Sequence, residues 1–421
     1  MRAVRERRVR RLAGGLSRCD RAAIGLLCAC CVGCFAPLAV SVAAEPSTGA
    51  ATTGAVRRTS TPTPPWRTGV AALGRHGVAL GGFLQVDGSH VIAGGIPDAL
   101  WLDKQYLLDL NVTVDTRALF GWPGGTLFVD FQSHSGPNVV ARQVPVLADA
   151  DNMDAPTFNA IDRAWYQQDF FGKKLQLQAG LMYVDDRFLT VPYGQNFVSL
   201  DFSSDASIST FVLPTYPRGA WGVEAWAYPT AHLSFAVGAF RDHATELPYD
   251  PGGNLLITEE AWRGTWHGLP YKLQLGAWTD DGRFRRFDGA PVRRGSGVYL
   301  VASDKLWAPA AAGSRGVGVF LQLGSGPPSV AAVRRHFGLG LVWTGPDRRR
   351  PHDEFGIALS DSFLSPEAGF AHGFEKEIET YYQFDLHHGW TLQPDLEYWQ
   401  HAGGGTTPDT WLGLVRAVFA F

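Results

Sequence analysis

Polar and apolar side chains alternate along residues 377–386, "EIETYYQFDL". One set is polar or polar-tipped: Glu377, Glu379, Tyr381, Gln383 and Asp385. The residues between them are nearly all apolar. Successive side chains of a β-strand point to opposite faces of its sheet, so this pattern predicts a strand with one polar and one apolar face. A protein built from such strands must place water on one side of the sheet and an apolar medium on the other.

The same alternation recurs along the chain, in segments bounded by clusters of Gly, Pro and Asp. Clear examples are "YLLDLNVTVD" (106–115), "KLQLQAGLMY" (174–183) and "HLSFAVGAF" (232–240). The connections alternate in length, because the short "FGWPGG" (120–125) is followed by a long connection at 135–159. Short turns at one end and long loops at the other are typical of a transmembrane β-barrel.

A soluble β-sandwich also alternates, but three features favour a membrane barrel. The polar face carries Gln, Glu, Asp and Gly in one segment after another. The segment "TWLGLVRAVFAF" (410–421) is amphipathic and ends in an aromatic residue. Aromatic residues also fall near predicted strand ends, where membrane interfaces would lie: Tyr106, Trp122, Tyr183, Tyr228, Trp343, Trp390 and Tyr398. We therefore expect the apolar face to contact lipid.

The acidic face favours a wet lumen, because burying unpaired carboxylates in a dry interior is costly. A spanning strand with its connection takes roughly 20 residues, so residues 76–421 predict about 16–18 strands. A barrel of that size leaves an aqueous pore. The expected fold is an all-β transmembrane antiparallel β-barrel of about 16 strands, with short periplasmic turns and longer extracellular loops.

Residues 1–44 have the features of a secretory signal peptide. Eight arginines precede an apolar run at 22–44, which ends in small residues. The alternatives are a permanent N-terminal anchor and lipidation at Cys30 or Cys34. Removing the segment takes away all five cysteines, eight of the 37 basic residues and two of the 40 acidic residues. The mature chain would then carry a net charge of −9, so nucleic acid is not an expected partner.

Residues 45–75 are rich in Thr, Pro, Ala and Gly without periodicity, which predicts a flexible leader. No second linker of this kind follows. Residues 76–421 are therefore expected to form one outer-membrane β-barrel domain.

Four stretches resemble the OprB-type carbohydrate-selective porin family: "LDLNVTVDTRALFGWPGGTLFVDF", "KLQLQAGLMYVDDRF", "PRGAWGVEAWAYPTAHLSFAVGAF" and "EIETYYQFDLHHGWTLQPDLEYWQHAGGG". The similarity runs from about Phe83 to Phe421 and is most specific at 377–405. It implies a barrel of about 16 strands in a Gram-negative outer membrane. It also implies facilitated diffusion of glucose-like sugars, through a pore narrowed by inward loops and lined by arginines and acidic residues.

The chain departs from that family in the strand before "GKKLQLQAG". Family members usually carry a Glu-aromatic-Glu alternation there, whereas this chain has Arg163, Trp165 and Gln167. Arg163 reverses the charge of one wall position, so the sugar preference of the family cannot be assumed for this chain.

Strand parity places a set of candidate sugar contacts on the lumenal wall: Arg163, Trp165, Gln167, Arg187, Glu224, Trp226, Glu377, Glu379, Asp395, Glu397 and Arg416. Carboxylates accept hydrogen bonds from sugar hydroxyls and guanidinium groups donate them. Aromatic faces offer surfaces on which sugar rings stack. The alternative is a solvated wall whose charges never touch solute, and Arg187 could instead pair with Asp185 or Asp186 at a strand end.

No metal, no cofactor and no enzymatic activity are expected. "DADNMD" (149–154) is acidic but lacks the spacing and the Gly of an EF-hand loop. No nucleophile, zinc or phosphate-loop motif occurs after residue 44. Two alternatives to a sugar channel remain, a barrel lipase and a structural barrel plugged by the loop at 133–159. The expected partners are sugars, the lipid bilayer, lipopolysaccharide and the outer-membrane assembly machinery, which would recognise Phe421.

Overall fold

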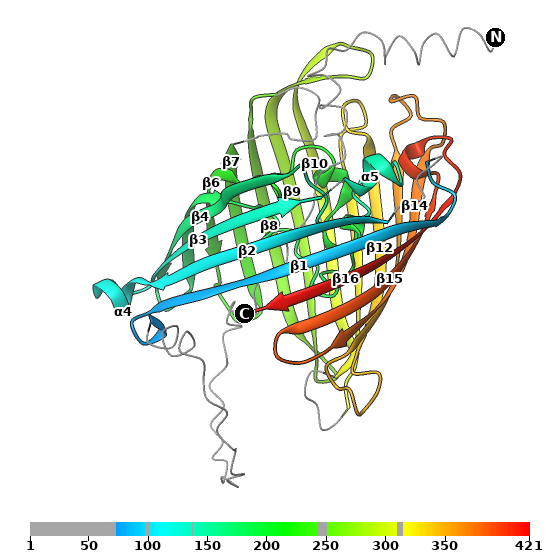
Figure 1. Ribbon diagram of the computed structural model, residues 1–421. Helices are drawn as coiled ribbons and strands as arrows, with labels where there is room; N and C mark the ends of the chain where they lie inside the picture. Colours follow the sequence, from blue (N-terminus) through cyan, green and yellow to red (C-terminus); the bar gives the residue numbers. More distant parts are fainter. Residues whose placement is uncertain (1–72, 97–101, 137, 242–250, 310–314) are drawn as a thin grey trace, which may run out of the picture.

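Sixteen strands, each antiparallel to its neighbours, close into one barrel in which β1 is hydrogen-bonded to β16 (Figure 1). The computed structural model describes residues 73–96, 102–136, 138–241, 251–309 and 315–421. The expected signal peptide and nearly all of the expected leader lie outside these residues. The all-β antiparallel barrel class is confirmed, and the strand number falls at the lower end of the predicted range.

The strands are β1 (Val78–Ala93), β2 (Asp103–Asp115), β3 (Gly125–Ser135), β4 (Phe158–Phe170), β5 (Leu175–Met182), β6 (Ala220–Ala227), β7 (Leu233–Arg241), β8 (Asn254–Trp266), β9 (Leu269–Arg285), β10 (Pro291–Trp307), β11 (Gly316–Ser325), β12 (Val333–Thr344), β13 (Glu354–Leu364), β14 (Phe374–Asp385), β15 (Trp390–Gln400) and β16 (Thr410–Ala420). The short helices are α4 (Thr116–Phe120), α5 (Val139–Arg142), α6 (Leu200–Ser203), α7 (Ala206–Ser209) and the 3-10 turn η2 (Ala402–Gly404). None of the helices in the described part of the chain is long and apolar enough to cross a membrane.

The two faces of the strands separate as the alternation predicts. In β2, Leu110 and Val112 are exposed on the outer surface, whereas Asp109 and Asn111 are buried on the inner one. In β14, Ile378 is 38% exposed between two fully buried glutamates. The apolar set therefore faces outward and the charged set faces inward.

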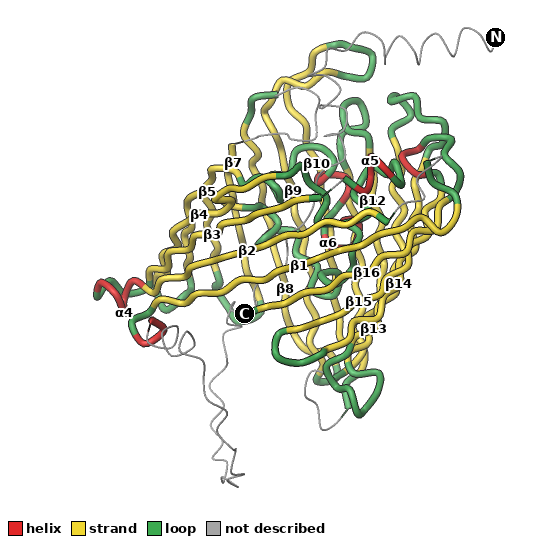
Figure 2. Tube along the Cα trace, in the orientation of Figure 1, coloured by secondary structure: helices red, strands yellow, loops and turns green. Residues whose placement is uncertain are grey.

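The connections are short at one end of the barrel and long at the other. At the turn end, residues 171–174 join β4 to β5 and residues 386–389 join β14 to β15. At the loop end, the β3–β4 connection spans 136–157 and the β5–β6 connection spans 183–219. Figure 2 shows α6, which belongs to the longer of these connections, within the barrel. These two connections therefore fold into the lumen.

Glycines on the inner face make room for what the lumen holds. A Cβ atom at Gly324 of β11 would lie 1.8 Å from a carboxylate oxygen of Asp205 in the β5–β6 connection. A Cβ atom at Gly276 of β9 would lie 1.9 Å from the ring of Tyr299 on β10. Close approach of another group over a strand is a common reason for glycine within it. The glycine content of the inner face thus reflects a filled interior.

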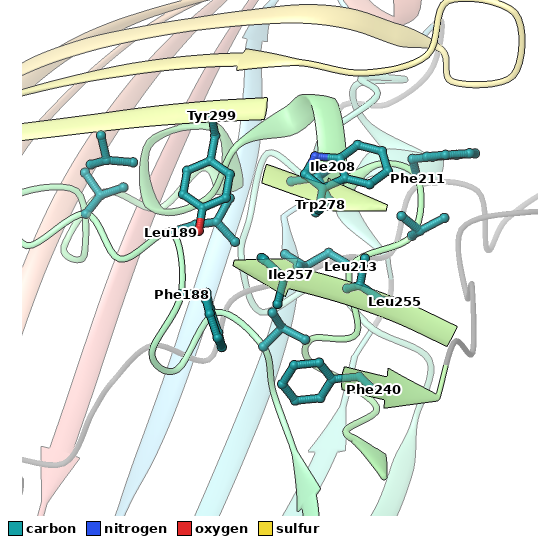
Figure 3. Close-up of a cluster of buried hydrophobic side chains, with 14 of the residues drawn as sticks. Phe188, Leu189, Ile208, Phe211, Leu213, Phe240, Leu255, Ile257, Trp278 and Tyr299 are labelled. Atoms are coloured by element: carbon teal, nitrogen blue, oxygen red, sulfur yellow. The ribbon is translucent and has the colours of Figure 1, made fainter. Parts of the chain in front are cut away.

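The largest hydrophobic core lies inside the barrel, between the β5–β6 connection and the wall. Figure 3 shows side chains from both sides of this core: Phe188, Leu189, Ile208, Phe211, Leu213, Phe240, Leu255, Ile257, Trp278 and Tyr299. For example, Phe211 packs on Phe284 of β9 with ring centroids 4.9 Å apart. The lumen was expected to be wet, and apolar loop side chains exclude water from the part of the wall that they cover.

β9 and β10 continue beyond the rest of the wall as a two-stranded ribbon. Pairing of β9 with β8 ends at Asp280, and pairing of β10 with β11 ends at Val298. The two strands go on pairing with each other as far as Arg285 and Pro291. Figure 1 shows this hairpin projecting at the loop end. It carries four exposed arginines: Arg283, Arg285, Arg293 and Arg294.

The barrel closes between segments that are far apart in the sequence. The β1–β16 ladder runs from the pair Phe83 and Ala420 to the pair Ala93 and Trp411. Beyond it, the amide of Phe421 donates a hydrogen bond of 3.0 Å to a carbonyl of the β1 strand. Closure of the wall therefore depends on both ends of the described barrel.

Candidate functional site

Two long connections occupy the lumen, and we name them the first inner loop (138–157) and the second inner loop (183–219). Both make hydrogen bonds to inward-facing side chains of the wall. Together they cover many of the inward-facing charges of β14, β15 and β16. Polar side chains of the inner wall that stay only partly buried therefore mark the surface left for a solute.

Arg416 of β16 fastens the first inner loop to the wall. Its Nε and Nη2 atoms lie 3.0 and 2.8 Å from Asp87 of β1. Nη2 also reaches Asp151 at 2.9 Å and Asn152 at 2.8 Å, both in the loop. The side chain of Gln105 on β2 donates to Asp151 at 2.7 Å. Arg416 faces inward, as predicted, but it is buried beneath this loop.

The second inner loop lies over the acidic residues of β14. The two carboxylate oxygens of Glu379 accept hydrogen bonds from the amides of Val198 at 2.6 Å and Ser199 at 3.0 Å. The Ser199 hydroxyl donates to Glu377 at 2.7 Å. Backbone and hydroxyl donors of the loop therefore take the place that solute was expected to occupy.

The same loop contacts distant strands of the wall. The amide of Leu189 donates to Glu259 of β8 at 3.0 Å. The Asp201 carboxylate accepts from the hydroxyl of Ser360 on β13 at 2.6 Å. Because it is tied at both sides of the barrel, the second inner loop narrows the lumen between them.

Arg163 of β4 faces the lumen, as predicted, and is held by three carboxylates. Its Nη2 atom lies 2.7 Å from Asp130 and 3.5 Å from Asp109. Its Nη1 atom lies 3.1 Å from Asp186 of the second inner loop. The ring of Tyr183 stands 4.9 Å from the guanidinium carbon. With only 4% of the residue exposed, Arg163 neutralises wall charge and presents little surface to a sugar.

Arg187 of the second inner loop lies at the edge of the open lumen. Its Nη1 atom is 3.0 Å from the Glu224 carboxylate, and its guanidinium carbon is 4.7 Å from the centre of the Trp226 ring. The side-chain oxygens of Gln176 and Gln178 accept from it at 2.7 and 3.2 Å. Its side chain is 20% exposed, whereas Glu224 beneath it is buried. This cluster therefore presents an arginine, backed by an aromatic ring, to the lumen.

Trp165 and Gln167 lie beside this cluster on β4. Trp165 stacks on Phe128 with ring centroids 5.0 Å apart and packs against the inner hydrophobic core. The side-chain oxygen of Gln167 accepts from Arg187 at 3.3 Å. Both face inward, as the parity predicts, and both are partly buried.

A second basic surface lies on β8 and β9, and the sequence analysis missed it. Arg263 and Lys272 are direct partners in the β8–β9 ladder, and both are partly buried. Arg263 donates to the hydroxyl of Ser234 on β7 at 2.9 Å, and Lys272 donates to the hydroxyl of Thr190 at 2.8 Å. Like charges directly opposite each other destabilise a sheet. Buried Glu259 of β8 attracts both cations and offsets part of this repulsion, and the exposed parts of the pair offer charged donors to the lumen.

Alternation along the sequence did not indicate Arg263 and Lys272 as lumenal residues, because the inner face of β8 is apolar at its loop end. Leu255 and Ile257 face inward and pack against the second inner loop, so the strand does not separate polar from apolar residues. The inward parity that Lys272 shares with Gln274 is the signal that could have found the basic pair.

The acidic ladder faces inward, as predicted, but it lies beneath the loops. Glu377, Glu379 and Glu397 are fully buried, and Asp395 is 7% exposed. The expectation of a water-facing acidic wall does not hold for these residues, because the second inner loop separates them from the lumen. Their part in sugar binding stays a prediction.

Most of the expected membrane-interface aromatics are exposed on the outer surface, among them Trp122, Trp343 and Trp390. Two are not. Tyr183 is buried against an arginine inside the barrel, and the Tyr228 hydroxyl lies 3.3 Å from Arg187. For these two, position near a strand end did not indicate contact with the membrane. Tyr183 begins the connection that turns into the lumen, and Tyr228 packs against the inner hydrophobic core.

A family model described as carbohydrate-selective porin, OprB family, matches residues 102–421. Porin B of Pseudomonas aeruginosa is 21% identical over 290 residues, which cover 58% of this chain and 64% of that protein. The match thus spans a little under two thirds of that relative. A high-pH structure of Pseudomonas putida OprB is similar with a TM-score of 0.78 and 17% identity, covering 85% of this chain and 97% of that one. A low-pH structure of the same protein has a TM-score of 0.59 at 15% identity, covering 86% and 98%. At this level of identity the structural similarity shows the fold alone, which is the same closed barrel.

Proposed function

This chain belongs to the OprB family of carbohydrate-selective porins, and from that membership we propose that it is a passive channel for neutral, glucose-like sugars. The family consists of porins and not of enzymes, and its members lie in the outer membrane of Gram-negative bacteria. The solute has to exchange its hydrogen bonds to water for hydrogen bonds to the wall as it passes.

The observations that support this proposal best are two partly buried basic clusters on the inner face, the one around Arg187 and the Arg263–Lys272 pair. Arg187, Arg263 and Lys272 supply charged donors there. Thr190 and Gln176 supply oxygen acceptors beside them. Each sugar hydroxyl is both a donor and an acceptor, so a surface that carries both kinds of group suits it.

Passage requires that this binding stays weak. A typical net hydrogen bond contributes about 0.5–1.5 kcal/mol, and bonds to charged groups about 1.5–3 kcal/mol. A few such bonds lower the barrier to entry, whereas many would hold the sugar in the pore. The second inner loop narrows the lumen, so a sugar contacts the wall instead of crossing through bulk water.

Sugar block of ion current through single channels in a planar bilayer tests the proposal. Arg263→Gln should weaken block by about 1 kcal/mol, or roughly fivefold, because one charged donor is lost. Arg294→Gln on the projecting ribbon is the matched control and should leave sugar affinity unchanged, since that residue lies outside the lumen.

Each failure has a distinct meaning. Current steps that sugars never reduce would refute the sugar assignment and leave a general porin. An absence of current steps would favour the structural barrel plugged by its loops. Hydrolysis of lipid esters by the purified protein would support the lipase alternative.

The arginines of the ribbon support lipopolysaccharide as a partner in the outer leaflet. Arg283 and Arg293 are direct cross-strand partners, and both are exposed. With Pro291 and Val292 they line a surface pocket of about 410 Å³. Two guanidinium groups in direct opposition favour a bridging anion such as a phosphate. Replacing both by Gln should lower the lipopolysaccharide that co-purifies, and an unchanged content would argue against this contact.

The outer aromatic face of β16 supports recognition by the outer-membrane assembly machinery. Phe421 is half exposed, and Phe419 stacks on Trp390 with ring centroids 4.7 Å apart. Phe421→Ala should slow insertion in cells without changing refolding in detergent. Equal insertion rates would contradict this role.

A further inference from the structure

Buried carboxylates of β14 and β15 meet at one point behind the second inner loop. Carboxylate oxygens of Glu377, Glu379 and Glu397 lie within 4.8 Å of one another. Glu379 and Glu397 are direct partners in the β14–β15 ladder. Asp395 lies on the same face of β15, two residues from Glu397. All four residues are buried, so four acidic groups share one space from which the loop excludes water.

Two oxygens of this cluster have no hydrogen-bond partner in the described structure, Oε1 of Glu377 and Oε1 of Glu397. Asp395 lies within hydrogen-bonding reach of Glu379 and Gln393. Arg416 attracts Asp395, and its Nη1 atom has no partner in the described structure, but its Nε and Nη2 atoms are bound to Asp87 and Asp151. One guanidinium group that serves other carboxylates cannot balance four more. A buried, uncompensated charge is strongly destabilising, so these carboxylates must either hold protons or gain a cation.

The donors that do reach the cluster orient it without filling it. The Ser199 hydroxyl donates to Oε2 of Glu377 at 2.7 Å. The indole Nε1 of Trp399 donates to Oε2 of Glu397 at 2.6 Å. These two donors each hold one oxygen of a carboxylate and leave the other free, whereas both oxygens of Glu379 accept from loop amides. Outer partners orient metal ligands in this way.

We propose that Glu377, Glu379 and Glu397 bind a Ca²⁺ ion, with Asp395 adding negative charge beside it. Ca²⁺ takes oxygen ligands at about 2.3–2.6 Å in flexible geometry, so oxygens within this spacing can share one ion. Mg²⁺ needs shorter bonds of about 2.0–2.1 Å in strict octahedral geometry and keeps its waters. The donor set holds no imidazole or thiolate, which zinc prefers.

The ion would fasten the second inner loop to the wall. It removes the repulsion among carboxylates directly beneath Val198 and Ser199, whose amides bind Glu379. Without the ion the carboxylates repel one another or take up protons, and the hydrogen bonds that hold the loop on β14 weaken. Divalent cation would thereby control how firmly the lumen is narrowed. The inference does not depend on which solute the lumen carries.

Terbium luminescence tests the site, because Tb³⁺ replaces Ca²⁺ at oxygen sites and is excited by energy transfer from a nearby indole. Trp399, bonded to Glu397, is in place to act as that indole. After treatment with a chelator, the full-length protein in detergent should bind Tb³⁺ saturably, and Ca²⁺ should displace it while Na⁺ does not. The double variant Glu377→Gln, Glu397→Gln should bind Tb³⁺ at least about tenfold more weakly.

Glu375→Gln is the matched control. Glu375 lies on the same face of β14, but its carboxylate already accepts hydrogen bonds from the amides of Leu147 and Gly403. This variant should keep the Tb³⁺ affinity of the wild type, and heat-modifiable migration verifies that each variant is folded. An absence of saturable Tb³⁺ binding by the wild-type protein overturns the site, even if the double variant fails to fold. Equal affinity in a folded double variant overturns it as well.

Discussion

Breaking the ion pair between Arg187 and Glu224 tests whether charge holds the second inner loop. In Arg187→Met an aliphatic chain still covers Trp226, but Glu224 loses the guanidinium that lies 3.0 Å away. The Glu224 side chain is only 2% exposed, so water cannot replace that partner. We expect the loop to loosen while the hydrogen-bonded wall stays intact.

The magnitude follows from the burial of the pair. Removing one partner of a buried ion pair costs about 3–5 kcal/mol, and the partial exposure of Arg187 places this pair near 3 kcal/mol. That free energy corresponds to about 150-fold more frequent opening of the loop. The double variant Arg187→Met, Glu224→Gln leaves no unpaired charge. Its cost should fall to about 1 kcal/mol, or roughly fivefold more opening.

Amide hydrogen exchange measures this opening inside the loop. The amides of Val184 and Phe188 are suitable probes, because they donate to the carbonyls of Pro214 at 2.9 Å and Val184 at 3.0 Å. The control is Arg286→Met, whose pairing with Glu367 is exposed on both sides and should contribute less than about 1 kcal/mol. If the double variant exchanges as fast as the single one, an unpaired carboxylate is not the cause and the reasoning fails.

Three further expectations concern facing, packing and pH. Thr380→Arg puts a charge on the lipid-facing side of β14 and should destabilise the assembled barrel by up to about 2–4 kcal/mol, whereas Gln383→Arg on the inner side should fold. Equal heat-modifiable migration of the two variants would contradict the assignment of these residues to the outer and inner faces. Gly324→Val should displace the second inner loop, because even the Cβ atom of a larger residue would clash with the Asp205 carboxylate. Protease cleavage within that loop should therefore increase, and unchanged resistance to the protease would count against close packing there. Burial raises the pKa of Asp185, in the second inner loop, from 3.8 to about 7. The docked loop therefore holds this proton more tightly than the free loop, and docking should weaken as the pH rises from about 4 to 7. Exchange of loop amides at about pH 5 and pH 8 measures this, Asp185→Asn should remove much of the difference, and pH-independent exchange in the wild type would refute it.

The facing of the wall could be predicted because the period of a strand is a local property. Ile378 is outside and Glu377 and Glu379 are inside, as alternation alone requires. The pairing register of β14 with β15 then follows from the short turn between them, so the partners of these residues on β15 were also predictable. The resemblance to porins added the inward loops and the sugar solute.

What covers the inner face could not be predicted from alternation. The amide that binds Glu379 belongs to Val198, which lies 181 residues earlier in the chain. No local pattern in "NFVSLDF" indicates that its backbone will meet an acidic strand. Leu255 and Ile257 of β8 face inward to pack against the same loop, so the alternation in β8 is lost and Arg263 was concealed. The facing of the wall residues depends on local sequence, whereas the contents of the lumen depend on contacts between segments distant in sequence.

The reach of the second inner loop has a consequence for how the protein is assembled. Its hydrogen-bond partners extend from Glu259 on β8 to Glu379 on β14, so the loop cannot form all of these bonds until the later strands are in place. An unclosed sheet would expose the edges of β1 and β16 together with the aromatic side chains that the loop buries in the finished barrel. Pairing of β1 with β16, from Phe83 and Ala420 onward, is therefore the step that removes the open edges. These partners of the second inner loop lie on the contiguous strands β8 to β14, so the loop can dock before that pairing forms, and the lumen can be narrowed by the time the barrel closes.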